Sequence, residues 1–398
     1  ILRPRAPGSQ DPALPPPSPL PPTSRVKEVV LAGACRTPIA KFQGGLASFR
    51  APELGGLAIR EALKRAGVAP DQVDEVIFGN VLQAGIGQNP ARQAARAGGV
   101  PDSVGAVTIN KVCGSGLKAV MLAAQAIRAG DADCIVAGGM ESMSNSPYLV
   151  RGAREGLRLG HGQLVDSMIF DGLWDIYNDF HMGMTGEKAA EKHGISRAQQ
   201  DEFAAESHAR AAAAEKAGRF AAERFAVPVP QRKGDPLLFQ TDENVRGDTT
   251  AQSIAGLKPA FKKDGGTVTA ANASSINDGA SAMLVMSADK AKALGIKPLA
   301  RVLGYATGGT APEWVMMAPE VSIKKLSAKL GRDPRSFDLH EINEAFSAAA
   351  CALTKVLELD PRKVNVNGGA VALGHPIGAS GARILTTLLY ALRERSLK

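Results

Sequence analysis

Short apolar runs alternate with helical stretches from Lys27 onward, and this alternation constrains the fold more than any other feature of the chain. The run KEVVLAGA is followed by PELGGLAIREALKRAG, by EVIFG, by a further helical stretch and by CIVAGG. Strands and helices that alternate at this spacing are typical of right-handed crossovers and a buried, mostly parallel sheet. The sequence therefore predicts an α/β fold.

Composition and charge exclude several classes of function. The chain has no run of eighteen apolar residues, so we expect no membrane-spanning helix and no membrane partner. The net charge is +8, but Lys and Arg are dispersed among acids without aromatic interleaving, which argues against a nucleic-acid partner. The four scattered cysteines lack metal-site spacing, so we expect no metal, reduced thiols and a cytoplasmic location.

The pattern divides the 398-residue chain into segments. Residues 1–24 hold nine prolines and are predicted to be a disordered tail. Residues 25–145 and 257–295 form an N-terminal half, residues 146–256 break the alternation as an inserted loop or lid domain, and residues 296–398 form a C-terminal half. Each half pairs a strand, a small-residue turn and a long helix, which indicates a weak internal duplication.

Cys113 is a candidate nucleophile. It lies in NKVCGSGLKAV, directly before a predicted amphipathic helix and beside glycines that allow close approach. The field of a helix N-terminus stabilises a thiolate, so we expect a lowered pKa for Cys113. A small buried cysteine at a strand end is the alternative interpretation, and a partner base decides between them.

His375 is the candidate base among six histidines. His193 and His208 lie in a polar helical region and are expected to be solvated. His375 lies in ALGHPIGASG, at a strand-to-helix turn of the second half that corresponds to the turn of Cys113 in the first. If the two halves pack together, the thiol and the imidazole meet in one cleft.

Asn343 is a third polar candidate, in the stretch EINEAF. A buried amide needs a hydrogen-bond partner. Asn343 is therefore either the cap of a helix start or a donor directed at a substrate carbonyl or a bound water.

These motifs together resemble the thiolase family. Cys113 in VCGSG, Asn343 in NEAF and His375 in GHPIGASG follow the family's chain order, and the similarity extends from about Lys27 to the end of the chain. A papain-like protease uses the same residue types but in the order Cys, His, Asn. A ketoacyl synthase has a related fold but places its catalytic residues in other local sequences.

The resemblance implies both fold and chemistry. It implies duplicated βαβαβαββ halves that form a layered α-β-α-β-α core with an inserted loop domain. It also implies an acetyl-CoA C-acetyltransferase activity, which joins two acetyl-CoA into acetoacetyl-CoA and CoA, or cleaves a 3-ketoacyl-CoA, through an acyl-cysteine. In this family pattern Cys113 is the nucleophile, His375 activates it and binds the thioester oxygen, and Asn343 holds a water. CoA thioesters are the substrates, no further cofactor is implied, and a homodimer or homotetramer is expected.

The stretch DGLWDIYNDFHMG resembles that of short-chain members of the family. The resemblance implies contacts with coenzyme A or the acyl group for a set of residues around it and farther along the chain. These are Leu173, His181, Met182, Arg246, Ser253, Ala270, Ser274, Ala345 and Phe346.

The family also carries a second cysteine in a Cys-x-Gly-Gly-Gly-x-Gly strand after the last helix, and the sequence stops at Lys398 before such a motif. The C-terminal half is thus expected to be truncated before its last strands, with impaired activity. A non-catalytic or acyl-transfer-only CoA-binding protein is the alternative if that end is authentic.

Overall fold

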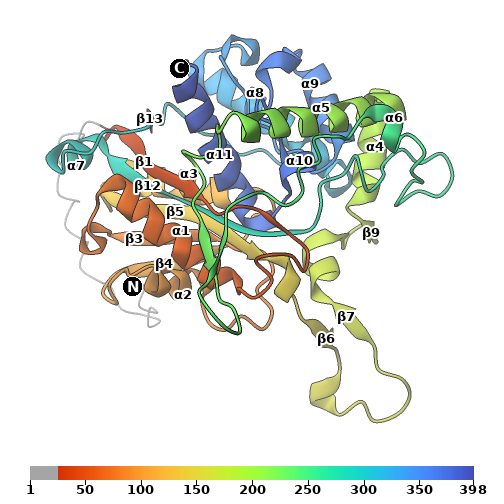
Figure 1. The fold of residues 1–398 in the computed structure, drawn as a ribbon, viewed down its shortest axis with the longest axis horizontal. Helices are drawn as coiled ribbons and strands as arrows, with labels where there is room; N and C mark the ends of the chain where they lie inside the picture. Colours follow the sequence, from red (N-terminus) through yellow and green to blue (C-terminus); the bar gives the residue numbers. More distant parts are fainter. Residues whose placement is uncertain (1–25) are drawn as a thin grey trace, which may run out of the picture.

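A seven-stranded sheet forms the centre of the molecule (Figure 1). The computed structural model describes residues 26–398, so the tail predicted for residues 1–24 lies outside the described residues. The strand order is β13-β1-β12-β5-β3-β4, and β2 pairs with β12. The strands are β1 (Val29–Arg36), β2 (Ala40–Lys41), β3 (Glu75–Gly79), β4 (Gly105–Ile109), β5 (Cys134–Ser142), β12 (Asn277–Ser287) and β13 (Ala300–Arg301).

The sheet is mixed, so the prediction of a mostly parallel sheet is wrong. Strand β3 runs parallel to β4 and β5. Strand β12 is antiparallel to both of its long neighbours, β1 and β5. The chain reaches β12 only after the inserted segment, and it enters the sheet from the opposite end. Hydrophobic alternation within a strand carries no information about that direction.

Helices cover both faces of the sheet, and the predicted layered α/β core is confirmed. Helices α1 (Ala51–Ala66) and α2 (Pro90–Ala97) pack on one face, and α3 (Ser115–Ala129) and α11 (Ile377–Glu394) pack on the other. The side chains of β1 alternate between the two cores: Val30 belongs to the first and Leu31 to the second. This division follows from the two-residue repeat of a strand.

Between β5 and β12 the chain leaves the sheet. It forms three hairpins and three helices, and the hairpin β6–β7 projects away from the rest of the molecule (Figure 1). The hairpin strands are β6 (Tyr148–Val150), β7 (Leu164–Asp166), β8 (Trp174–Asp175), β9 (Phe180–His181), β10 (Val227–Val229) and β11 (Leu237–Phe239). The helices are α4 (Gly183–His193), α5 (Arg197–Lys216) and α6 (Ala251–Ile254).

The chain after β12 is mainly helical, and α9 packs against α4 and α5 of the inserted segment. A parallel bridge joins His340 to Val364, and β13 pairs with β1 of the first half. The helices are α7 (Ala288–Ala293), α8 (Ala318–Leu330), α9 (Ser347–Val356), α10 (Ala370–Leu373) and α11.

Helices α3 and α11, the two helices that follow small-residue turns, pack directly on one another. A Cβ atom placed on Gly116 would lie 2.7 Å from Ala382 N, so only glycine allows this approach. The contact brings the start of each helix to the same region. Among residues 26–398, no helix has both the length and the apolar character needed to span a bilayer.

Candidate active site

Cys113 lies in the turn between β4 and α3, where the backbone adopts a costly conformation. Val112 has a φ of +47°, which is unfavourable for a β-branched residue. Asn110 Oδ1 accepts a hydrogen bond from Val112 N at 2.9 Å. Ser115 Oγ accepts from Lys111 N at 2.8 Å and donates to Val112 O at 2.6 Å. These bonds hold the turn that presents the Cys113 thiol.

His375 lies in the turn between α10 and α11, next to that thiol. Its Nε2 atom is 3.0 Å from Cys113 Sγ, and its Nδ1 atom is 2.6 Å from Ser380 Oγ. Ser380 Oγ donates its single proton to Pro376 O at 2.9 Å, so it accepts from the His375 Nδ1–H group. This hydrogen-bond network assigns the tautomer in which the lone pair of Nε2 faces the thiol.

Asn343 completes the cluster. Its Nδ2 atom lies 3.4 Å from His375 Nε2, and its buried Oδ1 atom has no hydrogen-bond partner within residues 26–398. Helix α9 begins at Ser347, with Phe346 as its N-cap, so Asn343 is not the cap of this helix. The structure therefore favours the second interpretation of Asn343, that of a polar group directed at the site.

Glu344 fixes the segment that carries Asn343. Its carboxylate is buried and accepts hydrogen bonds from Ser207 Oγ at 2.7 Å, Asn365 Nδ2 at 2.7 Å and Val371 N at 3.1 Å. These donors come from three different parts of the chain. A carboxylate with this number of donors is a rigid anchor for its neighbours.

Burial sets the protonation of the cysteine–histidine pair. It raises the pKa of the Cys113 thiol to about 12, with the Glu141 charge adding to the rise. It lowers the pKa of His375 to about 3, helped by Arg383. The expectation of a lowered cysteine pKa is therefore wrong, because desolvation outweighs the helix field. At rest the pair is a neutral thiol beside a neutral imidazole, with Nε2 placed to accept the proton of the thiol.

The structure places several of the predicted substrate-binding residues together near this pair. Leu173 packs in the same apolar cluster as Cys113. Met182 donates its backbone N–H to Leu173 O at 2.8 Å. Ser274 N donates to Ala345 O at 2.9 Å.

An aromatic group adjoins these residues. His181 stacks on Phe261 with a centroid distance of 4.6 Å, and Phe261 meets Phe346 edge-on at 6.2 Å. Phe346 also packs in one apolar cluster with Met182 and Ala345. Sequence reasoning missed Phe261, although a large aromatic residue between KPA and KKD is a visible signal.

The remaining three predicted residues do not belong to the apolar cluster of Cys113. Arg246, Ser253 and Ala270 are exposed. Arg246 N donates to His208 Nδ1 at 3.1 Å, and Ser253 N donates to the side chain of Thr250, the N-cap of α6. No hydrogen bond within the described part of the chain joins them to Cys113 or His375. His208 itself is buried, so the expectation that it is solvated is wrong.

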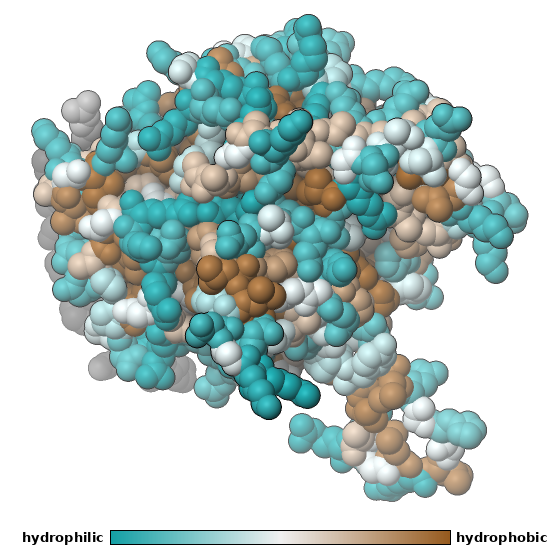
Figure 2. Space-filling view, in the orientation of Figure 1, coloured by the Kyte–Doolittle hydropathy of each residue, from teal (hydrophilic) through white to brown (hydrophobic). Residues whose placement is uncertain are grey.

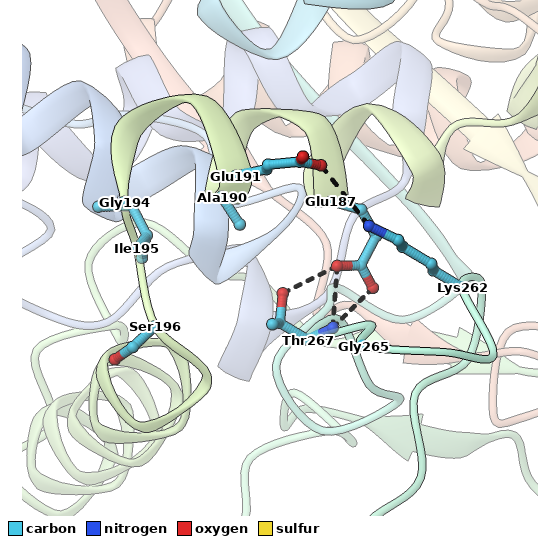
Figure 3. Close-up of a pocket in the computed structure, with 9 residues that line it drawn as sticks. All are labelled: Glu187, Ala190, Glu191, Gly194, Ile195, Ser196, Lys262, Gly265 and Thr267. Atoms are coloured by element: carbon cyan, nitrogen blue, oxygen red, sulfur yellow. Dashed lines mark hydrogen bonds and ion pairs between the residues drawn. The ribbon is translucent and has the colours of Figure 1, made fainter.

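A hollow of about 510 Å³ lies elsewhere, between the end of α4 and the loop 262–267 (Figure 3). Its wall includes Glu187, whose buried carboxylate accepts hydrogen bonds from Thr267 and from Val268 N. Glu191 and Lys262 form an ion pair across it at 3.5 Å. None of the three clustered residues, Cys113, His375 and Asn343, lines this hollow. Within residues 26–398, no three His, Cys, Asp or Glu side chains are grouped as metal ligands would be.

Comparison with known proteins gives one consistent family. Residues 29–289 match the family model "Thiolase, N-terminal domain", and residues 296–398 match "Thiolase, C-terminal domain". The chain is 57% identical over 371 residues to an acetyl-CoA acetyltransferase of Cupriavidus necator, covering 93% of this chain and 94% of that protein. It is 56% identical over 373 residues to one from Pseudomonas aeruginosa, covering 94% and 95%. The crystal structure of the Bacillus anthracis acetyl-CoA acetyltransferase matches with a TM-score of 0.91 at 43% identity, covering 94% of each chain.

Proposed function

This chain belongs to the thiolase family, and from that premise we propose that it is an acetyl-CoA acetyltransferase with Cys113 as the acylated residue. It is an enzyme of the acyltransferase class, and the similarity favours this activity over a non-catalytic CoA-binding protein. The observation that carries the residue assignment is the 3.0 Å separation between Cys113 Sγ and the unprotonated Nε2 of His375. The reaction uses CoA thioesters as its substrates and needs no further cofactor.

The first half-reaction follows from this geometry. His375 Nε2 takes the proton of Cys113 as the sulfur bonds to the carbonyl carbon of acetyl-CoA. The bond from that carbon to the coenzyme A sulfur then breaks, and the leaving thiolate takes the proton from His375. General-base assistance of this kind contributes roughly 10² to 10⁴ in rate. The acetyl group is left on Cys113. In the second half-reaction the α-carbon of another acetyl-CoA gives up one proton and bonds to the acetyl carbon as the bond from that carbon to Cys113 Sγ breaks. The released Cys113 thiolate takes up one proton, so acetoacetyl-CoA and the free thiol result.

Stabilisation of the oxyanion comes from the same residues. Once protonated, His375 Nε2–H is a donor to the thioester oxygen, and Asn343 holds a water as a second donor. The free hydrogen-bonding capacity of the Asn343 amide supports this role. A fixed donor directed at developing negative charge is worth about 3 kcal/mol.

The substrate is held by an apolar part and a polar part. Leu173, Met182, Ala345 and Phe346 surround the acetyl group and the pantetheine arm, and Ser274 and His181 border them. The exposed Arg246, Ser253 and Ala270 meet the nucleotide end of coenzyme A. A guanidinium group there suits a phosphate because it offers several donors in one plane.

The enzyme forms a homo-oligomer in this proposal. The projecting hairpin β6–β7 exposes Tyr148, Leu159 and Leu164, and hydrophobic residues lie among polar ones on its surface (Figure 2). Apolar surface on a protruding element is typical of a subunit contact. We place the enzyme in the cytoplasm, because its four cysteines are unpaired in the structure.

Mass spectrometry tests the acylated residue. The protein is incubated with acetyl-CoA, digested and searched for an acetyl adduct, which we expect on Cys113. Cys113→Ala should abolish the adduct, while Cys351→Ala, a substitution of the other partly exposed cysteine, should leave it in place. An adduct on Cys35, Cys134 or Cys351 in the unsubstituted protein contradicts the assignment.

A further inference from the structure

The turn that carries His375 is attached to the first half of the molecule at two points. His375 N donates to Asn277 Oδ1 at 2.7 Å, and Gly378 N donates to Glu141 Oε2 at 2.8 Å. Asn277 starts β12 and Glu141 lies near the end of β5, and both side chains are buried. These strands belong to the half that also presents Cys113. The cysteine and the histidine are thus joined through the backbone of the histidine turn.

Glu141 collects four donors on one carboxylate. Its Oε1 accepts from Asn80 Nδ2 at 2.6 Å and from Leu82 N at 3.1 Å. Its Oε2 accepts from Val81 N at 3.1 Å and from Gly378 N at 2.8 Å. Every one of these partners is a donor, so an amide in place of the carboxylate would direct an NH₂ group at two N–H groups. The site therefore requires a carboxylate.

Glu141 also replaces a missing helix cap. The N-cap of α11 is Pro376, whose side chain has no hydrogen-bond acceptor. Gly378 N is one of the amides at a helix start that have no partner within the helix. A carboxylate from another strand satisfies it and also places negative charge at the positive end of the helix dipole.

The contact is close enough that two glycines are required. A Cβ atom on Gly378 would lie 2.6 Å from Met140 O, and one on Gly139 would lie 2.0 Å from Gly378 O. The end of β5 therefore touches the first turn of α11 backbone to backbone. A shift in either element moves the other.

We propose that Glu141 is a positioning residue for acyl transfer, which holds the first turn of α11 against β5 and so sets the distance from His375 Nε2 to Cys113 Sγ. The proposal rests on the proposed function. Asn277 is the second anchor of the same turn. A displacement of about 1 Å between reacting groups costs up to roughly 10² in rate, so the anchors act on catalysis without touching the substrate.

Alkylation of Cys113 by iodoacetamide in the free enzyme measures this role without any CoA substrate. In Glu141→Gln we expect the alkylation rate to fall by about tenfold or more, toward that of His375→Ala. Loss of the Glu141 charge alone should instead raise the alkylation rate, because that charge raises the pKa of Cys113. An unchanged or faster alkylation in Glu141→Gln overturns the proposal.

Glu187→Gln is the matched control. Glu187 is also a buried carboxylate that accepts backbone N–H groups, but it lies on α4 at the separate hollow. We expect it to lose a similar amount of thermal stability while its alkylation rate stays within about twofold of the unsubstituted protein, since it contacts neither turn. Equal slowing in both variants overturns the proposal, because it would reflect general loosening of the structure.

Asn277→Ala provides a second variant if Glu141→Gln does not fold. It removes the acceptor of His375 N, and alkylation is expected to slow by a similar factor. Normal alkylation in a folded Asn277→Ala protein contradicts the positioning role. Failure of the proposed function gives a different result, namely no acetyl adduct on Cys113 in the unsubstituted protein.

Discussion

Ser380 determines the direction of proton transfer at His375. Its hydroxyl is committed to Pro376 O as a donor, so it can only accept from the imidazole. Without it both tautomers of His375 become accessible, and in one of them Nε2–H faces the thiol and cannot take its proton. The tautomer of His375 that faces Cys113 thus depends on Ser380.

Ser380→Ala is therefore expected to slow acetylation of Cys113 by about 10-fold to 100-fold, measured by rapid quench in a single turnover. Ser281→Ala is the matched control, because Ser281 Oγ is also buried and donates to a carbonyl, that of Cys35, at 2.9 Å. The control should acetylate at close to the normal rate. If both serine variants slow equally, the tautomer assignment is wrong.

The sequence predicts Cys113, His375 and Asn343 as site residues, because two of them lie in turns before helices and all three lie in motifs that resemble those of the thiolase family. It missed Glu141 and Asn277, whose partners in the histidine turn are 237 and 98 residues away. A buried glutamate in the apolar run CIVAGGMES is visible in the sequence, but only the fold shows which donors surround it. The direction of the pKa shift of Cys113 could not be predicted from the sequence either, because it depends on burial.

The alternation of strands and helices along the first part of the chain could be predicted from the sequence, but the strand order in the sheet and the direction of β12 could not. The repeated strand–turn–helix pattern predicts corresponding turns in the two halves, and the structure packs α3 and α11, the helices that follow these turns, against each other. The prediction of a strand before the His375 turn is wrong, because the short helix α10 precedes it. Hydrophobic periodicity thus predicts where a strand or helix lies in the sequence, but it does not predict the direction of a strand in the sheet.

The exposed leucines of hairpin β6–β7 predict that this element contributes to a subunit contact. Leu159 is 99% exposed and Leu164 is 70% exposed. Exposure of apolar side chains to water is unfavourable, and burial in a subunit contact would remove this cost. The double substitution Leu159→Asp and Leu164→Asp should lower the mass measured by light scattering after size exclusion. Acetylation of Cys113 should persist, since the hairpin does not contribute to the cysteine–histidine pair.

The control for the hairpin is a second pair of exposed leucines. Leu237 and Leu238 on β11 are 61% and 55% exposed and lie on a different hairpin. Changing both to aspartate adds the same charge but should leave the mass unaltered. An unchanged mass in the Leu159 and Leu164 variant contradicts the role of hairpin β6–β7.

At the scale of the whole molecule, helix α5 joins the inserted segment to the second half, since it packs against α6, α9 and α10. Its polar sequence predicted an exposed His208, yet the side chain is buried and its Nδ1 atom accepts a hydrogen bond from Arg246 N. Burial, together with the nearby Arg246 charge, lowers the pKa of His208 to about 4. In the unfolded chain the value is about 6.5.

This difference makes the stability of the molecule depend on pH. As the pH falls from 6.5 toward 4, the unfolded chain binds a proton at His208 that the folded protein does not, so unfolding becomes easier. The contribution of His208 is complete above pH 6.5 and is lost on acidification through this interval. Protonation would also remove the Nδ1 acceptor that holds Arg246 N.

His208→Asn tests this directly, because an asparagine oxygen can replace the Nδ1 acceptor but does not titrate. The free energy of unfolding, measured in urea at pH 7 and at pH 5, should fall less in His208→Asn than in the unsubstituted protein. The difference should be on the order of 1 kcal/mol once solvent screening is allowed for. His161→Asn, which changes an exposed histidine on the projecting hairpin, should reproduce the full loss of the unsubstituted protein. If His208→Asn loses as much stability as His161→Asn, the acid sensitivity comes from other groups, and α5 does not couple protonation to unfolding.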